Sequence, residues 1–216
     1  MSTGRATIID LVRALPDAAA ADAWLQTAGE AELETALALL NRALHGLRLI
    51  LADPDRHEVA REQLLVARVG YGGGEEVADG LWSEARELVL RPAHQSRQRV
   101  LQPQARLAAM LAGRERALVC EELTLRARSD LQRGREREAA LGLLVALDAA
   151  LSELPRDPQV AVLGGRIEEL RGQRDAAADA AQAALGGPLP AAAREEVEFV
   201  LGRIEAALRA RAVAST

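Results

Sequence analysis

The chain has 216 residues, of which 49% are apolar and 27% charged, and its formal net charge is −5. This length allows one large domain or two small ones. A weakly acidic chain lacks the cationic excess that nucleic-acid binding needs, and no stretch reaches the roughly 20 apolar residues of a membrane-spanning helix. The first residues lack the layout of a signal peptide and Cys120 has no second cysteine to pair with, so we expect a cytoplasmic protein.

The apolar half of the sequence is mostly Ala and Leu, its aromatic residues are two Trp, one Tyr and one Phe, and Lys is absent. Ala and Leu are strong helix formers, whereas strands prefer β-branched and aromatic residues. We interpret the absence of Lys as the codon bias of a high-GC bacterial genome. The composition predicts an all-α fold without strands, whose core consists of Leu side chains set among small Ala residues.

Residues 1–90 are expected to form a helical bundle. Capping residues, prolines and glycines delimit five predicted helices in it, at 7–15, 17–29, 30–51, 55–69 and 75–90, with a glycine loop at 70–74. The strongest is 30–51, where leucines step by fours and threes along one face: Leu33, Leu37, Leu40, Leu44, Leu47 and Leu51. This stripe either packs within the chain or pairs with a second copy, so a homo-oligomer stays open.

Residues 91–104 contain few apolar side chains and several arginines, among them Arg91, Arg97 and Arg99. We expect this segment to be a linker or mobile loop between two halves of the chain. Its arginines are also candidates for contact with an acidic partner or a nucleic acid. The segment lacks the interleaved aromatic residues that stack on bases, which favours a solvated loop.

The second half, residues 105–216, is predicted to contain only helices. Six are expected, at 104–112, 115–133, 135–154, 159–171, 175–185 and 191–212, separated mainly by glycines and prolines. We expect them to stack as antiparallel hairpins, with the last helix as a cap.

Small residues recur in this half with one spacing. Adding 38 to each of Ala127, Gly134, Ala139 and Ala146 leads to Gly165, Gly172, Ala177 and Ala184. This pattern resembles the tetratricopeptide repeat over about residues 115–190, although that family's period is 34. The resemblance implies paired helices and a concave groove that receives a peptide. Arg128 and Arg166 occupy equivalent positions that face the groove in the family, so the resemblance predicts that both clamp an acidic side chain or a C-terminus of a partner. The alternative is a surface ion pair for each, such as Arg166 with Glu169.

Motifs for catalysis, metals and cofactors are weak. The glycine loop 70–74 precedes Glu75 and Glu76, which would repel a phosphate. The three histidines lack metal-ligand spacing, and the neighbours of Cys120 are acidic, which favours a buried structural thiol over a nucleophile. We therefore expect no catalytic residue, no metal and no cofactor.

Three functional hypotheses follow. The first is a non-catalytic adaptor or scaffold that binds a protein or peptide partner through its helical hairpins. The second is a nucleic-acid-associated accessory protein that uses the arginines of residues 91–106. The third is a small helical enzyme with a pocket near Tyr71 and Trp82.

Overall fold

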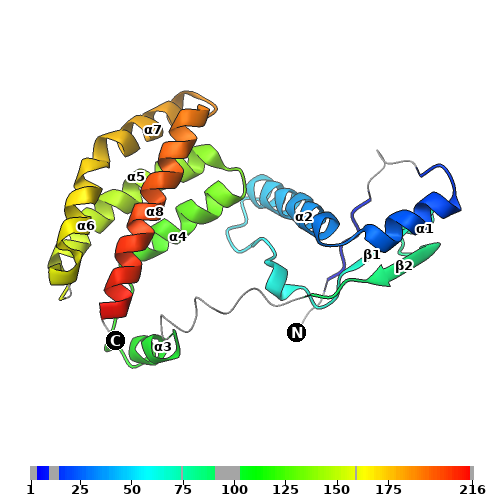
Figure 1. Cartoon of the computed structure of the whole chain (residues 1–216), viewed down its shortest axis with the longest axis horizontal. Coiled ribbons are helices and arrows are strands. Elements are labelled where there is room, and N and C mark those ends of the chain that lie inside the picture. The colour runs from blue at the N-terminus through cyan, green and yellow to red at the C-terminus, as the bar shows by residue number, and fades with distance from the viewer. Residues whose placement is uncertain (1–3, 10–14, 74, 91–102, 159, 215–216) are drawn as a thin grey trace. The chain divides into compact units, whose positions relative to one another are not determined.

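The computed structural model describes the whole chain except residues 1–3, 10–14, 74, 91–102, 159 and 215–216 (Figure 1). The chain forms two compact units, residues 1–93 and residues 94–216. The described part is mostly helical and contains two short strands, which confirms the all-α class with packed helices but not the expected absence of strands. The division between the units lies at the predicted linker, of which residues 91–102 are outside the described part.

As far as it is described, the N-terminal unit combines two α-helices with a β-hairpin. Its elements are α1 (Ala18–Thr27), α2 (Glu30–Ile50), β1 (Arg68–Tyr71), β2 (Glu84–Glu87) and two single 3₁₀ turns, η1 (Arg61–Gln63) and η2 (Glu75–Val77). Both α-helices start where a side chain caps them: the Asp17 carboxylate accepts the Ala20 N–H at 2.8 Å, and the Glu32 carboxylate accepts the Gly29 N–H at 2.6 Å. These caps agree with the start sites predicted from the sequence.

The predictions of helices at 55–69 and 75–90 are wrong, so this unit differs from the expected bundle of helices. Strands β1 and β2 pair antiparallel there, with Arg68 opposite Glu87 and Tyr71 opposite Glu84. The glycines explain the difference, because a Cβ on Gly70 would lie 2.6 Å from the Glu84 carbonyl oxygen of the facing strand. The helix predicted at 7–15 is also not formed over residues 7–9, and its residues 10–14 are outside the described part.

In the described residues of the C-terminal unit, six α-helices lie at the predicted places. They are α3 (Pro103–Leu111), α4 (Val119–Gln132), α5 (Glu136–Glu153), α6 (Val160–Gly172), α7 (Arg174–Gly186) and α8 (Ala191–Ala214), with a 3₁₀ turn, η4 (Leu154–Arg156), after α5. Gly134 turns the chain between α4 and α5 with a φ of 71°, in the left-handed region that favours glycine. The predicted helix boundaries in this half are thereby confirmed to within a few residues.

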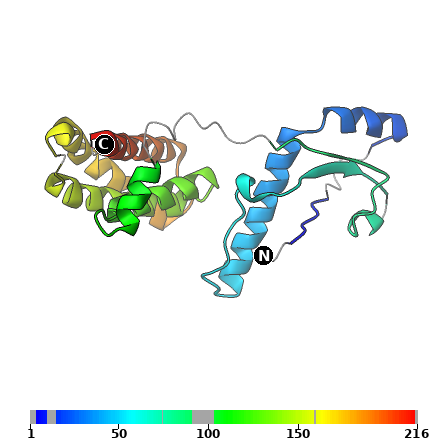
Figure 2. The ribbon, with the colours of Figure 1, turned by 90° about the horizontal axis from the view of Figure 1, so that it is seen from below.

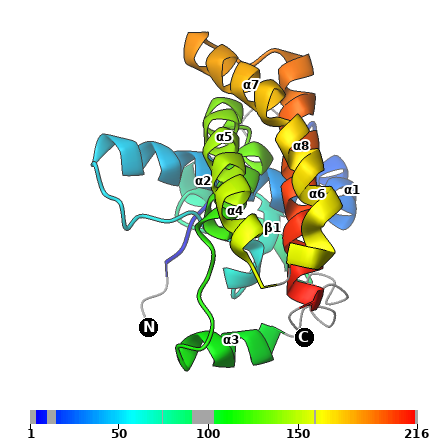
Figure 3. The same ribbon diagram turned by 90° about the vertical axis from the view of Figure 1, so that its left-hand side faces the viewer.

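Helices α4 and α5 pack side by side, α7 packs on α5, and α8 runs back past α7 and α6 while also contacting α4 and α5 (Figures 1 and 3). Only Gln173 separates α6 from α7, and these two helices touch each other little. The long helix α8 thus joins the others into one core, which is more than the cap expected from the sequence.

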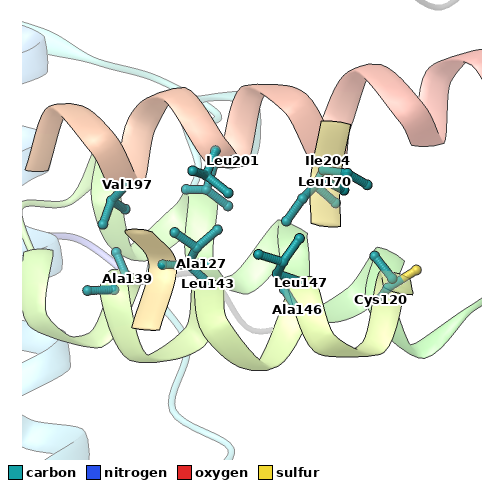
Figure 4. Close-up of a cluster of buried hydrophobic side chains, with 14 of the residues drawn as sticks. Cys120, Ala127, Ala139, Leu143, Ala146, Leu147, Leu170, Val197, Leu201 and Ile204 are labelled. Atoms are coloured by element: carbon teal, nitrogen blue, oxygen red, sulfur yellow. The ribbon is translucent and has the colours of Figure 1, made fainter. Parts of the chain in front are cut away.

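The core of this unit consists of large aliphatic side chains among alanines, as the composition predicted (Figure 4). Five alanines of the proposed repeat have no exposed surface: Ala127, Ala139, Ala146, Ala177 and Ala184. Small residues let α4 and α5 approach closely, since a Cβ on Gly142 would lie 3.4 Å from the Ala127 Cβ. Around them Leu143, Leu147 and Leu201 are completely buried.

The N-terminal unit has far fewer buried apolar residues in its described part. Its buried apolar residues in the described part are mostly small: Ala21, Ala28, Ala67, Val69 and Val77. Small side chains contribute little burial free energy. We infer that this unit is the less stable of the two.

Candidate interaction surfaces

The leucine stripe of α2 is only partly covered, and no residue of this 21-residue helix is buried. Its first four leucines, from Leu33 to Leu44, are half-buried, whereas Leu47 and Leu51 are 42% and 56% exposed. The stripe therefore divides into a covered part and an exposed part.

The chain that follows α2 turns back along one side of the helix (Figure 2). The side-chain amide of Asn41 donates to the Val59 carbonyl at 3.0 Å and accepts the Val59 N–H at 2.8 Å. Nearer the start of the helix, Arg61 donates to the Glu30 carboxylate. These contacts hold the returning chain on the side of Asn41.

An exposed apolar surface runs from the middle of α2 to its C-terminal cap, and we call it the α2 strip. It consists of Leu39, Ala43, Leu47, Ile50 and Leu51. Steps of three and four residues place these side chains on one face of the helix. Ile50, at 80%, is the most exposed of its four large side chains. A contiguous exposed apolar surface is typical of an interaction site.

Two arginines flank this strip. At about 100° per residue, Arg42 and Arg48 project to opposite sides of it. Both are exposed, and neither has an ion pair with another described residue. The strip thus has an apolar centre with a cationic edge.

Tyr71 and Trp82, the residues of the hypothetical enzyme pocket, lie near each other at the hairpin, where the Ser83 N–H donates to the Tyr71 carbonyl at 2.9 Å. The Tyr71 hydroxyl donates to the Asp22 carboxylate of α1 at 2.6 Å. This hydrogen bond raises the pKa of Tyr71 to about 12. The phenol therefore stays protonated, and its hydrogen bond connects α1 to β1. A phenol that keeps its proton does not suit the role of a general base.

A network of charged side chains lies at one end of the C-terminal unit, where α3, α4 and α8 meet. Arg211 of α8 is 8% exposed, donates to Asp157 at 2.6 Å and lies 3.4 Å from the Glu121 carboxylate. Arg106 of α3 donates to Glu115 at 2.8 Å and to both oxygens of Glu121 at 2.7 and 2.8 Å. Burial opposes the charge of Arg106, but the hydrogen bonds to these two carboxylates outweigh it and raise the pKa of its guanidinium.

Cys120 lies beside this network and is completely buried, as predicted for a structural thiol. The Glu153 carboxylate caps α4 by accepting the Val119 and Cys120 N–H groups at 3.0 and 2.9 Å. Burial, and then the hydrogen bond to Glu153, raise the pKa of the Cys120 thiol well above its ordinary value. Burial opposes the charge of Glu153, but the hydrogen bonds from Cys120 and Val119 outweigh it and lower the pKa of this carboxyl. The site favours an inert thiol.

The two predicted clamp residues have different surroundings. The Arg128 Nε lies 2.7 Å from the Glu205 Oε1 on α8, so this arginine already holds a carboxylate of its own chain. Arg166 is exposed and has no ion pair within the described part of the chain. Its suggested partner, Glu169, instead lies 3.3 Å from Arg203 of α8. A clamp formed by both arginines stays a prediction, and it would require Glu205 to leave Arg128.

Arg91, Arg97 and Arg99 lie outside the described residues. Arg106, at the end of the arginine-containing segment 91–106, is occupied by Glu115 and Glu121. The nucleic-acid hypothesis therefore depends on arginines that the described part does not include.

Among the described residues no three His, Cys, Asp or Glu side chains are arranged to hold a metal ion. His45 faces Glu58, with 3.8 Å between its Nδ1 and the Glu58 Oε1. In the same part of the chain, none of the helices combines the length and apolarity that crossing a bilayer requires.

Sequence reasoning missed the charged network because Arg211, which joins Asp157 to Glu121, lies 54 and 90 positions from them along the chain. Glu121 stands three residues after Leu118 and accepts its N–H at 3.0 Å, and this helix-start spacing is the single signal the sequence carried. Nothing local indicated that Arg106 and Arg211 would converge on Glu121.

The tetratricopeptide-like repeat stays a prediction beside these observations. Comparison with protein-family models, with curated proteins and with solved structures finds no match to this chain.

Proposed function

We propose that this protein is a non-catalytic adaptor or scaffold and that a partner protein binds it at the α2 strip. The observation that supports this is the exposure of large apolar side chains in a row on α2, with Leu47, Ile50 and Leu51 at 42%, 80% and 56%. Water-exposed apolar surface of this kind is stabilised when another protein covers it.

The α2 strip, rather than a groove between the C-terminal helices, is the proposed site because the C-terminal core is already filled. Helix α8 contacts the four helices α4 to α7 and buries Val197, Leu201 and Ile204 completely. Its Glu205 already accepts the hydrogen bond from Arg128 that a carboxylate of a partner would need. A peptide would have to displace this helix before it reached those surfaces.

The expected contribution of the strip follows from its exposure. Full burial of a Leu or Ile side chain contributes about 1.5–3 kcal/mol, so covering the exposed parts of Leu47, Ile50 and Leu51 contributes roughly 3–5 kcal/mol. Association itself costs several kcal/mol, so these three side chains would act as the centre of a larger interface. Arg42 and Arg48 at its edge favour a partner with acidic residues around an apolar surface.

The test compares Ile50→Glu with Leu125→Glu, which places the same charge on an exposed leucine of α4. Both variants and the original chain are used as bait in native lysate, and captured proteins are quantified by mass spectrometry. We expect a partner that the original chain and Leu125→Glu retain and that Ile50→Glu loses. The combined Arg42→Glu and Arg48→Glu exchange should weaken capture of the same partner.

Sedimentation velocity of the purified chain identifies the case in which the partner is a second copy. A dimer that Ile50→Glu converts to a monomer would assign the strip to self-association. A partner that binds all variants equally would refute the assignment of the site to α2.

A further inference from the structure

Helix α3 is attached to the C-terminal unit differently from the other five helices. Neither the buried core nor the half-buried apolar residues packed on it include a described residue of α3. Leu107 and Leu111 are 56% and 80% exposed, and Ala109 and Met110 are half-buried. Apolar burial of the described side chains, from Arg106 onward, therefore contributes little to holding this helix.

Arg106 supplies the connection that burial does not. Its Nε donates to the Glu115 carboxylate, and its Nη2 donates to both oxygens of Glu121 on α4, at 2.7 and 2.8 Å. The side chain is 29% exposed, and that of Glu121 is 14% exposed. Hydrogen bonds between charged groups at such a site are stronger than those on an open surface, yet water and salt still reach them.

Departure of Arg106 would not leave a buried carboxylate without a partner. Glu121 still accepts the Leu118 N–H at 3.0 Å and still lies 3.4 Å from Arg211. Glu115 still has Arg211 within 3.8 Å. Among the described side chains, the release of Arg106 thus costs its own hydrogen bonds and the small apolar contact of α3.

A released α3 would also lose its helical structure. It has nine residues, and an isolated helix of this length is unstable in water because too few hydrogen bonds follow its costly first turn. Docking and helix formation are therefore coupled in α3.

We propose that α3 is an electrostatic latch: Arg106 holds it on Glu115 and Glu121, and it detaches and unfolds as a unit while α4 to α8 stay folded. Opening uncovers the two carboxylates for a cationic side chain of a partner. It also adds residues 103–114 to the chain segment that connects the two units. Because the latch is an ion pair, rising ionic strength shifts it toward the open form.

The test is hydrogen–deuterium exchange of the full chain, read separately for α3 and for α5. Arg106→Gln removes the positive charge and the guanidinium N–H groups that donate to Glu115 and Glu121. The matched control is Arg126→Gln, which breaks an exposed Arg126–Glu122 ion pair on α4 that does not involve α3. We expect exchange in α3 to be about 10- to 100-fold faster in Arg106→Gln, with α5 unchanged. Arg126→Gln should match the original chain in both helices.

Two further measurements sharpen the result. Arg106→Lys keeps the charge but loses the fork geometry, so its α3 should exchange at an intermediate rate. Raising NaCl from 0.05 to 0.5 M should accelerate α3 exchange in the original chain and have little effect in Arg106→Gln. The proposal is overturned if α3 exchanges equally in the original chain and in Arg106→Gln, or if α5 loses protection together with α3.

Discussion

Leu143 on α5 provides the sharpest test of the C-terminal core. Its side chain has no exposed surface, and its helix contacts α4, α7 and α8, so neighbours on three sides limit collapse into a cavity. Leu143→Ala should therefore lower the free energy of unfolding by about 3–5 kcal/mol. Such a loss is a large fraction of the 5–15 kcal/mol that is usual for a domain, and it corresponds to a Tm lower by roughly 10 °C or more.

The matched control is Leu141→Ala, two positions away on the same helix, where the leucine is 36% exposed. This exchange removes the same atoms but leaves little cavity, and we expect a loss of about 1 kcal/mol or less. Urea unfolding followed by circular dichroism at 222 nm reports mainly on the C-terminal unit, which contains most of the helical residues. Similar losses for the two variants, or a loss below 1 kcal/mol for Leu143→Ala, would refute the assignment of the core.

Three other outcomes are expected. Gly165→Ala should stabilise α6 by about 0.5–1 kcal/mol in thermal unfolding because a Cβ there meets no atom within 4 Å, whereas Gly134→Ala should cost about 1 kcal/mol because of its φ of 71°. Tyr71 should ionise near pH 12 in an absorbance titration at 295 nm, and Asp22→Asn should move its pKa toward the ordinary value of about 10. Because the folded pKa is the higher one, this contribution to stability is present below pH 10 and is lost between about pH 10 and 12. The thiol of Cys120 should react with Ellman's reagent slowly in the folded chain and fully in 6 M guanidinium; fast reaction when folded would contradict its burial.

The sequence predicted the C-terminal helices well because the relevant signals are local. Ala and Leu favour helix at each position, and a glycine or proline interrupts the pattern wherever one helix ends. The small residues of the proposed repeat also indicated close packing, and Ala127, Ala139 and Ala146 are indeed completely buried. The prediction of a structural thiol at Cys120 rested on its acidic neighbours Glu121 and Glu122, which are likewise a local signal.

The N-terminal hairpin was not predictable in the same way. Residues 64–71 and 81–90 carry apolar side chains at spacings that fit a helix as well as a strand, and the choice depends on pairing with a segment far along the chain. Gly70 permits that pairing, but its role is visible only when Ala85 lies opposite it.

The amino-acid sequence by itself thus determined the helical class, the positions of the C-terminal helices and the amphipathic character of α2, because each depends on neighbours within a few residues. The tertiary structure alone decided which part of the leucine stripe stays exposed, since the chain returning past Asn41 covers one side of α2. It also decided that Arg106 and Arg211 meet at Glu121 and that Arg128 is taken by Glu205. These contacts join residues between 15 and 90 positions apart, and their energies depend on burial and distance, which local sequence patterns do not contain.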